Sequence, residues 1–116
     1  KKYIINNTFN FIKDFHLKYH FHIVSGSDEK ELQYLCSMLD LSSFFITING
    51  SPVEKKTLVK NIIYKYKYNL KDICLIGDSV NDLDAANDNK ISFFGYNNVN
   101  LINNNNYIRS FNAFKF

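Results

Sequence analysis

The sequence predicts an α/β protein built on a parallel sheet, and two observations support this fold class. Short apolar runs, each bounded by turn residues, have the length and near-continuous apolarity of strands covered on both faces. They occupy residues 21–25, 43–48, 73–77 and 91–95. Helical patterns lie between these runs, and strands that alternate with helices imply right-handed βαβ units.

The helices are expected over about residues 8–19 and in the segments that follow residues 28 and 51. In the second of these helices, Asp28 and Glu31 have the spacing of a capping box. Its apolar residues recur at helical spacing, and they are Leu32, Leu35, Cys36 and Leu39. The third helix is predicted to begin with Ser51 as N-cap and Pro52 at its first position.

Composition excludes several functional classes. The 116 residues make one domain or part of one, and 46% apolar residues supply a core. No apolar run approaches the roughly 18 residues of a membrane span, so no membrane partner is expected. The net charge of +3 is too small and scattered to predict nucleic-acid binding. Cys36 and Cys74 lie in apolar patterns and indicate free thiols in a reducing, cytoplasmic compartment.

In parallel sheets, ligands bind beyond the carboxyl ends of the strands. We therefore expect the functional site among the residues that follow the predicted strands. Ser25 and Gly26 follow the first predicted strand, and a helix begins shortly afterwards. We interpret Gly26 as the residue that allows a tight turn. A hydroxyl, free backbone N–H groups and a helix N-terminus together form a good anion site. The alternative is an ordinary strand-to-helix turn with a serine cap.

Lys55 is a second candidate. It precedes Leu58 by three residues and Val59 by four, so it shares the inward face of the predicted helix. Lys56 lies about 100° further round and is the alternative if the helical phase differs by one position. A lysine in a first turn opposes the helix dipole and needs an anionic partner there. The alternative is that Lys55 extends into solvent from the helix end.

Asp78 and Asp82 form the third candidate, in the stretch GDSVNDLDAA. Asp78 stands at a strand tip, and Asp82 shares a helix face with Ala85 and Ala86, which lets that helix pack closely on the sheet. Two adjacent carboxylates repel unless a cation joins them, and their hard oxygens suit Mg²⁺. The alternative is a turn aspartate beside a capping aspartate. Taken together, the three candidates predict a phosphate group held against Mg²⁺.

The order strand–Ser-Gly, Gly-Ser-Pro-x-x-Lys and Gly-Asp-Ser-x-x-Asp resembles motifs II, III and IV of the haloacid dehalogenase-like (HAD) hydrolase superfamily. The resemblance covers about residues 9–96, and small phosphatases like phosphoglycolate phosphatase are the nearest subfamily. It implies a Rossmann-like three-layer α/β/α core. It also implies a Mg²⁺-dependent phosphatase that acts on a small phosphorylated metabolite through an aspartyl-phosphate intermediate.

The resemblance also implies a role for each candidate. Ser25 matches the residue whose hydroxyl holds the transferring phosphoryl group, with Gly26 beside it. Lys55 matches the lysine that neutralises the phosphate and the nucleophile. Asp78 matches the acid of the Mg²⁺ site, and Asp82 is its partner, in direct contact or through water.

The family's motif I, an apolar strand ending in Asp-x-Asp, is not found in this sequence. The one Asp-x-Asp stretch is Asp82-Leu83-Asp84, which lies within a predicted helix. We therefore expect the central strand of the sheet, the nucleophile and the general acid to lie outside this chain. Residues 1–7 are then a return from a cap or linker, and residues 8–116 are the carboxyl-terminal portion of the core domain. Such a fragment is expected to be inactive alone.

Other functions are compatible with the same motifs. A non-catalytic phosphate- or protein-binding module would have the same fold, and phosphomutases share the motifs. True dehalogenases work without a metal and lack the Gly-Asp pair found here as Gly77-Asp78. A phosphoacceptor receiver domain would place its acids after early strands, whereas here they come late. The sequence does not specify the oligomeric state.

Overall fold

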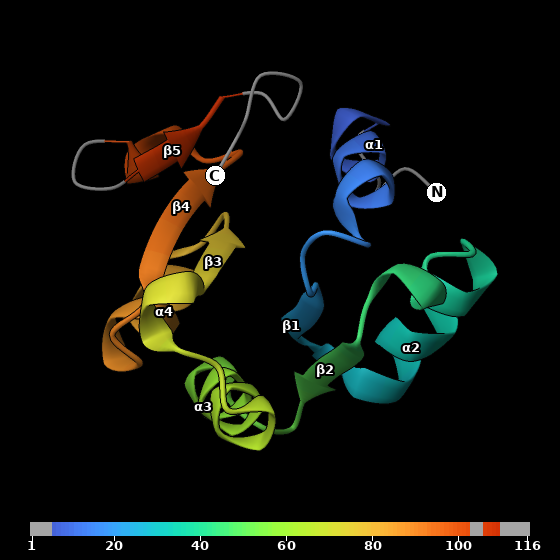
Figure 1. Cartoon of the computed structure of the whole chain (residues 1–116), viewed down its shortest axis with the longest axis horizontal. Coiled ribbons are helices and arrows are strands. Elements are labelled where there is room, and N and C mark those ends of the chain that lie inside the picture. Colours follow the sequence, from blue (N-terminus) through green and yellow to red (C-terminus); the bar gives the residue numbers. More distant parts are fainter. Residues whose placement is uncertain (1–5, 103–105, 110–116) are drawn as a thin grey trace. The chain divides into compact units, whose positions relative to one another are not determined.

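The computed structural model describes residues 6–102 and 106–109, with side chains from residue 11 onward. Helices and strands alternate along the chain (Figure 1). They are α1 (Asn6–Phe15), β1 (His22–Asp28), α2 (Glu29–Met38), β2 (Thr47–Ser51), α3 (Lys55–Tyr66), β3 (Cys74–Gly77), α4 (Val80–Asp88), β4 (Ser92–Tyr96) and β5 (Asn106–Ile108). All strand pairs are parallel, as the α/β fold class requires. None of the helices in the described ranges is long and apolar enough to cross a bilayer.

The chain forms two compact units that meet in sequence after Pro52. In the first unit, β1 pairs with β2, so that Ile23 lies opposite Ile48. Helix α2 packs against both strands. Its side chains also bond to β2: Gln33 donates an amide N–H to the Ile48 carbonyl at 3.1 Å, and Glu29 accepts from the Gly50 N–H at 3.0 Å. The helix is thereby fixed to the strand by hydrogen bonds as well as by packing.

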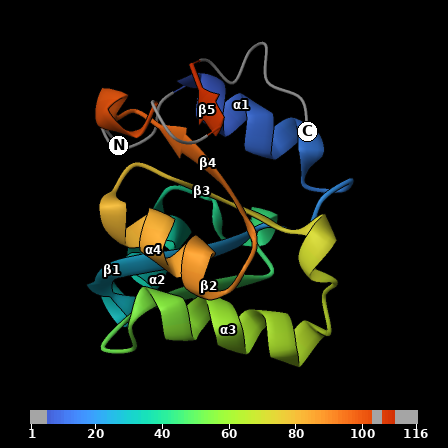
Figure 2. The ribbon, with the colours of Figure 1, turned by 90° about the vertical axis from the view of Figure 1, so that its left-hand side faces the viewer.

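The second unit runs from Val53 to Arg109 and contains a three-stranded sheet in the order β3-β4-β5. Helix α4 packs against β3 and β4, and α3 lies beside α4 (Figure 2). The two alanines on the buried face of α4 are at most 1% exposed, which allows close approach to the sheet. The buried apolar residues of this unit are Leu58, Val59, Leu75, Ala85, Ala86, Ile91, Phe93, Leu101 and Ile108.

Two local predictions in the first unit are wrong. The run expected as a strand over residues 43–48 begins as a 3₁₀ turn (Ser42–Phe44), and β2 starts only at Thr47. Ser51 is not a helix cap, because it ends β2 and pairs with Asp28. Helix α3 starts at Lys55, and no side chain caps it. Pairing with β1 extends the strand as far as Ser51, the first of the residues that resemble a helix start.

The ends of α1 and β1 also differ from expectation. Helix α1 begins at Asn6 and stops at Phe15, rather than spanning 8–19. The expected return segment 1–7 therefore overlaps this helix at its last two residues, and residues 1–5 lie outside the described part. Strand β1 continues to Asp28 instead of ending at Gly26. Asp28 still caps α2 by accepting from the Glu31 N–H at 3.0 Å, as predicted.

The strand pairing forms two separate sheets, which agrees with the prediction that the central strand of the sheet is not part of this chain. Among the described residues, β1 pairs with β2 alone, and β3 pairs with β4 alone. Strands β1 and β3 therefore each have one edge whose N–H and C=O groups have no strand partner among the described residues. Buried backbone groups of this type are almost always paired in folded proteins.

His22 provides a test of the first unit. Its ring Nδ1 lies 2.6 Å from the Thr47 hydroxyl, and burial, with a smaller contribution from His20, lowers the pKa of His22 below its ordinary value of 6.5. The unfolded chain then binds a proton at His22 more readily than the folded chain does. The protein therefore keeps its full free energy of unfolding above about pH 6.5 and loses part of it as the pH falls below that value. We expect the urea midpoint to decrease between about pH 7 and pH 5. The decrease should be smaller in His22→Asn, and equal slopes would contradict this assignment.

Candidate active site

The turn from β3 into α4 is organised by reciprocal capping. Ser79 is the N-cap of α4, and its hydroxyl accepts from the Asp82 N–H at 3.1 Å. The Asp82 Oδ2 atom accepts in return from the Ser79 N–H at 3.2 Å and from its hydroxyl at 2.9 Å. Oδ2 also accepts from the Asp78 N–H at 3.1 Å. This capping box fixes the backbone just beyond the carboxyl end of β3.

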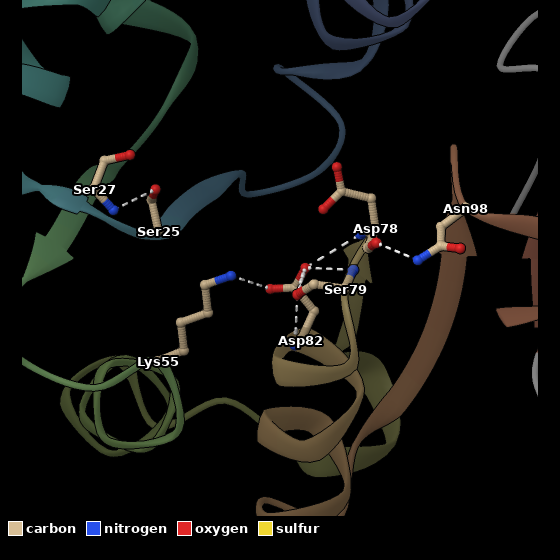
Figure 3. Close-up of polar contacts among 7 residues, drawn as sticks. All are labelled: Ser25, Ser27, Lys55, Asp78, Ser79, Asp82 and Asn98. Carbon is tan, nitrogen blue, oxygen red and sulfur yellow. Dashed lines mark hydrogen bonds and ion pairs between the residues drawn. The ribbon is translucent and has the colours of Figure 1, made fainter. Parts of the chain in front are cut away.

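Asp82 also forms an ion pair with Lys55, between Oδ1 and Nζ at 2.8 Å (Figure 3). The side chains are 9% and 21% exposed, so the pair is largely withdrawn from water. Lys56, by contrast, is exposed. The helical phase predicted from the sequence is therefore confirmed, and the anion that Lys55 needs at the start of α3 is Asp82.

Gly77 is required by the position of Asp82. A Cβ atom at residue 77 would collide with the Asp82 side chain, including its carboxyl group. The carboxylate thus lies directly against the last residue of β3. A side chain at this position has to displace α4 or break the capping box.

Asp78 differs from Asp82 because its side chain is exposed and has no hydrogen-bond partner among the described residues. In Figure 3 the Asp78 side chain extends past the end of β3, while the Asp82 carboxylate lies between Lys55 and the backbone of Asp78 and Ser79. The Asp78 backbone is nevertheless held on both sides. Its N–H donates to Asp82, and its carbonyl accepts from the Asn98 amide at 2.9 Å. Sequence reasoning missed Asn98, although an amide residue just after a parallel strand is a signal of the kind used for Asp78.

Ser25 and Gly26 lie in the first unit, Ser25 at the middle of β1 and Gly26 directly after it along the strand. The Ser25 hydroxyl accepts from the Ser27 N–H at 3.1 Å. No described glycine has a positive φ, and a Cβ at Gly26 would meet open space, so the predicted tight turn at Gly26 is wrong. The backbone instead continues as an irregular strand, with a register shift between Val24 and Asp28.

The donors present fit a hard cation only in part. Asp78 presents an unshared carboxylate, the type of oxygen ligand that Mg²⁺ prefers. Asp82 already accepts from Lys55 and from three donors of the capping turn, so it has little free capacity for direct ligation. The described residues contain no group of three or more side chains suited to a metal. The predicted metal contact of Asp82 stays a prediction.

The cysteines do not supply a nucleophile. Burial raises the pKa of the Cys74 thiol, at the start of β3, to about 11, and it also raises the pKa of Cys36. The thiolate is the reactive form of cysteine, and at neutral pH a group with a pKa near 11 is almost entirely protonated. Both residues are free thiols that pack as small apolar side chains.

The chain belongs to the haloacid dehalogenase-like hydrolase family, because the model of that family matches residues 3–96. No protein with a curated description matches the chain.

Solved structures give the same fold. One is a haloacid dehalogenase-like family hydrolase from Streptococcus pneumoniae, with 19% identity, a TM-score of 0.80, and coverage of 90% of this chain and 54% of that one. Another is a HAD-superfamily hydrolase from Ehrlichia chaffeensis, with 16% identity, a TM-score of 0.78, and coverage of 92% and 53%. A protein from Lactobacillus delbrueckii subsp. bulgaricus, described as a phosphoglycolate phosphatase, has 15% identity, a TM-score of 0.74, and coverage of 89% and 48%. The chain therefore spans about half the length of the structures it resembles.

Replacing Gly77 by alanine tests the capping turn. The added methyl group collides with Asp82, so we expect Gly77→Ala to lower the free energy of unfolding by about 2–4 kcal/mol through overpacking and loss of the cap. Gly26→Ala is the matched control, because its Cβ enters open space and should change stability by less than about 1 kcal/mol. Urea unfolding of the full-length protein measures both. Similar effects of the two substitutions would contradict the close approach at Gly77.

Proposed function

We propose that this chain is part of a Mg²⁺-dependent phosphomonoesterase that acts through an aspartyl-phosphate intermediate. The observation that carries the proposal is the arrangement beyond β3. There the Asp78 carboxylate is unshared, and Asp82 of the same turn accepts from the Asp78 N–H and holds the Lys55 ammonium in place. A cation site next to a fixed ammonium is suited to the charge of a transferring phosphoryl group. Membership of the hydrolase family supports the same reaction class.

Asp78 is the Mg²⁺ ligand in this proposal. Bound there, Mg²⁺ would supply charge stabilisation to the phosphoryl oxygens. The Asp78 carboxylate is suited to this role because it is exposed and unshared, while its backbone is fixed by two hydrogen bonds. A ligand held in this way loses little conformational freedom when the ion binds.

Lys55 acts on the phosphate. A lysine ammonium has three N–H donors, and Asp82 accepts one of them at 2.8 Å. The ion pair orients the ammonium, while further donors are left for a phosphoryl oxygen. Asp82 is then the residue that positions Lys55, and a contact with Mg²⁺ through water is compatible with this role.

Ser25 and Gly26 are proposed as the phosphate-binding residues of β1. The Ser25 hydroxyl uses a lone pair to accept from Ser27, so its O–H stays available to donate to a phosphoryl oxygen. The absence of a side chain at Gly26 leaves space in front of the exposed end of the strand.

The nucleophile is proposed to be an aspartate outside these 116 residues. The one Asp-x-Asp stretch, Asp82-Leu83-Asp84, lies in α4, and Asp82 is committed to Lys55 and to the capping turn. The proposed substrate is a small phosphorylated metabolite. A cytoplasmic location is proposed as well, and the two free cysteines, Cys36 and Cys74, support it.

Removal of the proposed metal ligand tests the reaction class. We expect the full-length protein to hydrolyse p-nitrophenyl phosphate with Mg²⁺ and to lose this activity with EDTA. Asp78→Asn keeps the shape of the side chain but removes its charge, so it should weaken Mg²⁺ binding by at least about tenfold, as followed by isothermal titration calorimetry. Asp84→Asn is the matched control, because Asp84 is an exposed carboxylate on α4. Equal Mg²⁺ affinity in wild type and Asp78→Asn would remove Asp78 from the site.

The two adjacent lysines of α3 test the phosphate contact. Lys55→Ala removes one charged contact to the phosphoryl group and should lower kcat/KM by about a hundredfold. Lys56→Ala removes an exposed charge and should lower it by less than about threefold. Steady-state kinetics in saturating Mg²⁺ compares the two. A larger loss in Lys56→Ala would place the catalytic ammonium on the other residue.

A further inference from the structure

We propose that Asn98 is a positioning residue that holds the Asp78 carboxylate in place for cation binding. The inference rests on the proposed function, because it assigns Asp78 to the metal. Asn98 follows β4 and reaches the neighbouring strand end, where its Nδ2 donates to the Asp78 carbonyl at 2.9 Å (Figure 3). None of the described hydrogen bonds joins Asn98 to the Asp78 carboxylate itself, so its effect on a bound cation is indirect.

The peptide groups on either side of the Asp78 Cα are fixed by side chains from different elements. Asp82 of α4 accepts from the Asp78 N–H at 3.1 Å, and Asn98 donates to the Asp78 carbonyl. The backbone torsions of an exposed turn residue are otherwise free to vary, and ordering them when a cation binds costs conformational entropy. The two bonds together aim a carboxylate that has no described hydrogen-bond partner of its own.

Asn98 is itself held by two further hydrogen bonds. Its Oδ1 accepts from the Asn100 N–H at 3.1 Å, and its own N–H donates to the Tyr107 hydroxyl of β5 at 3.1 Å. The tyrosine ring packs against β4 at Gly95, where a Cβ would come within 3.0 Å of the ring and 2.9 Å of Leu101. A chain of contacts therefore runs from β5 through Asn98 to the end of β3.

A purely local role for Asn98 is the competing explanation, because its side chain also caps the 3₁₀ turn Val99–Leu101. Asn98→Ser separates the two roles. A serine hydroxyl can still accept from the Asn100 N–H, as serine does in similar turns. Its shorter side chain does not reach the Asp78 carbonyl, so the cap stays while the bridge to β3 is lost.

The experiment is a Mg²⁺ titration of the full-length protein by calorimetry, combined with thermal unfolding without the ion. Asn98→Ser should raise the Mg²⁺ dissociation constant on the order of tenfold. Its kcat should return to near the wild-type value at saturating Mg²⁺, with the KM for p-nitrophenyl phosphate unchanged. Asn100→Ala is the matched control, since its exposed side chain lies in the same turn and makes no described hydrogen bond. It should leave the Mg²⁺ affinity unchanged.

Unchanged affinity in Asn98→Ser, or an equal weakening in Asn100→Ala, would overturn the positioning role and leave the proposed function intact. A wild-type protein that binds no Mg²⁺ would overturn both. If Asn98→Ser does not fold, Tyr107→Phe decides the question, because it removes only the hydroxyl that holds the Asn98 N–H. We expect Tyr107→Phe to weaken Mg²⁺ binding by about threefold, and an unchanged affinity would overturn the proposal.

Discussion

The Asp82 carboxylate is the group on which the geometry of the candidate site depends. Its two oxygens accept from Lys55, from both donors of Ser79 and from the Asp78 N–H. A buried carboxylate is tolerated here because both of its oxygens accept hydrogen bonds from donors of the protein. Its position in the first turn of α4 adds the favourable field of the helix dipole.

The ion pair between Lys55 and Asp82 explains how a lysine can stand at the start of a helix. Lys55 is the first residue of α3, where the dipole disfavours a cation. Asp82 offsets this cost and binds α3 to α4. Breaking a buried ion pair by removing one partner costs about 3–5 kcal/mol. The figure is smaller here, because 21% of the Lys55 side chain is still exposed to solvent. One interaction thus joins two helices and fixes the position of the Lys55 ammonium.

Much of the second unit could be predicted from local sequence. The phase of the apolar residues in α3 placed Lys55 inward and Lys56 outward, because side chains three and four positions apart share a helix face. The pattern of Asp82, Ala85 and Ala86 placed the buried face of α4 in the same way. These features depend on helical periodicity alone, and periodicity is visible in a single sequence.

The first unit and the role of Asn98 were decided by contacts between distant parts of the chain. Ser51 has the local features of a helix cap, but pairing with Asp28 makes it the end of a strand. Asn98 lies twenty residues from Asp78, and the two meet only because β3 and β4 run parallel and end at the same edge. The sequence by itself determined β3, β4 and the buried face of α4, together with the inward lysine and the acids, because these follow from periodicity and residue chemistry. Only the tertiary structure decided where β2 ends and which side chains hold Asp78, because hydrogen bonds between strands override local preference.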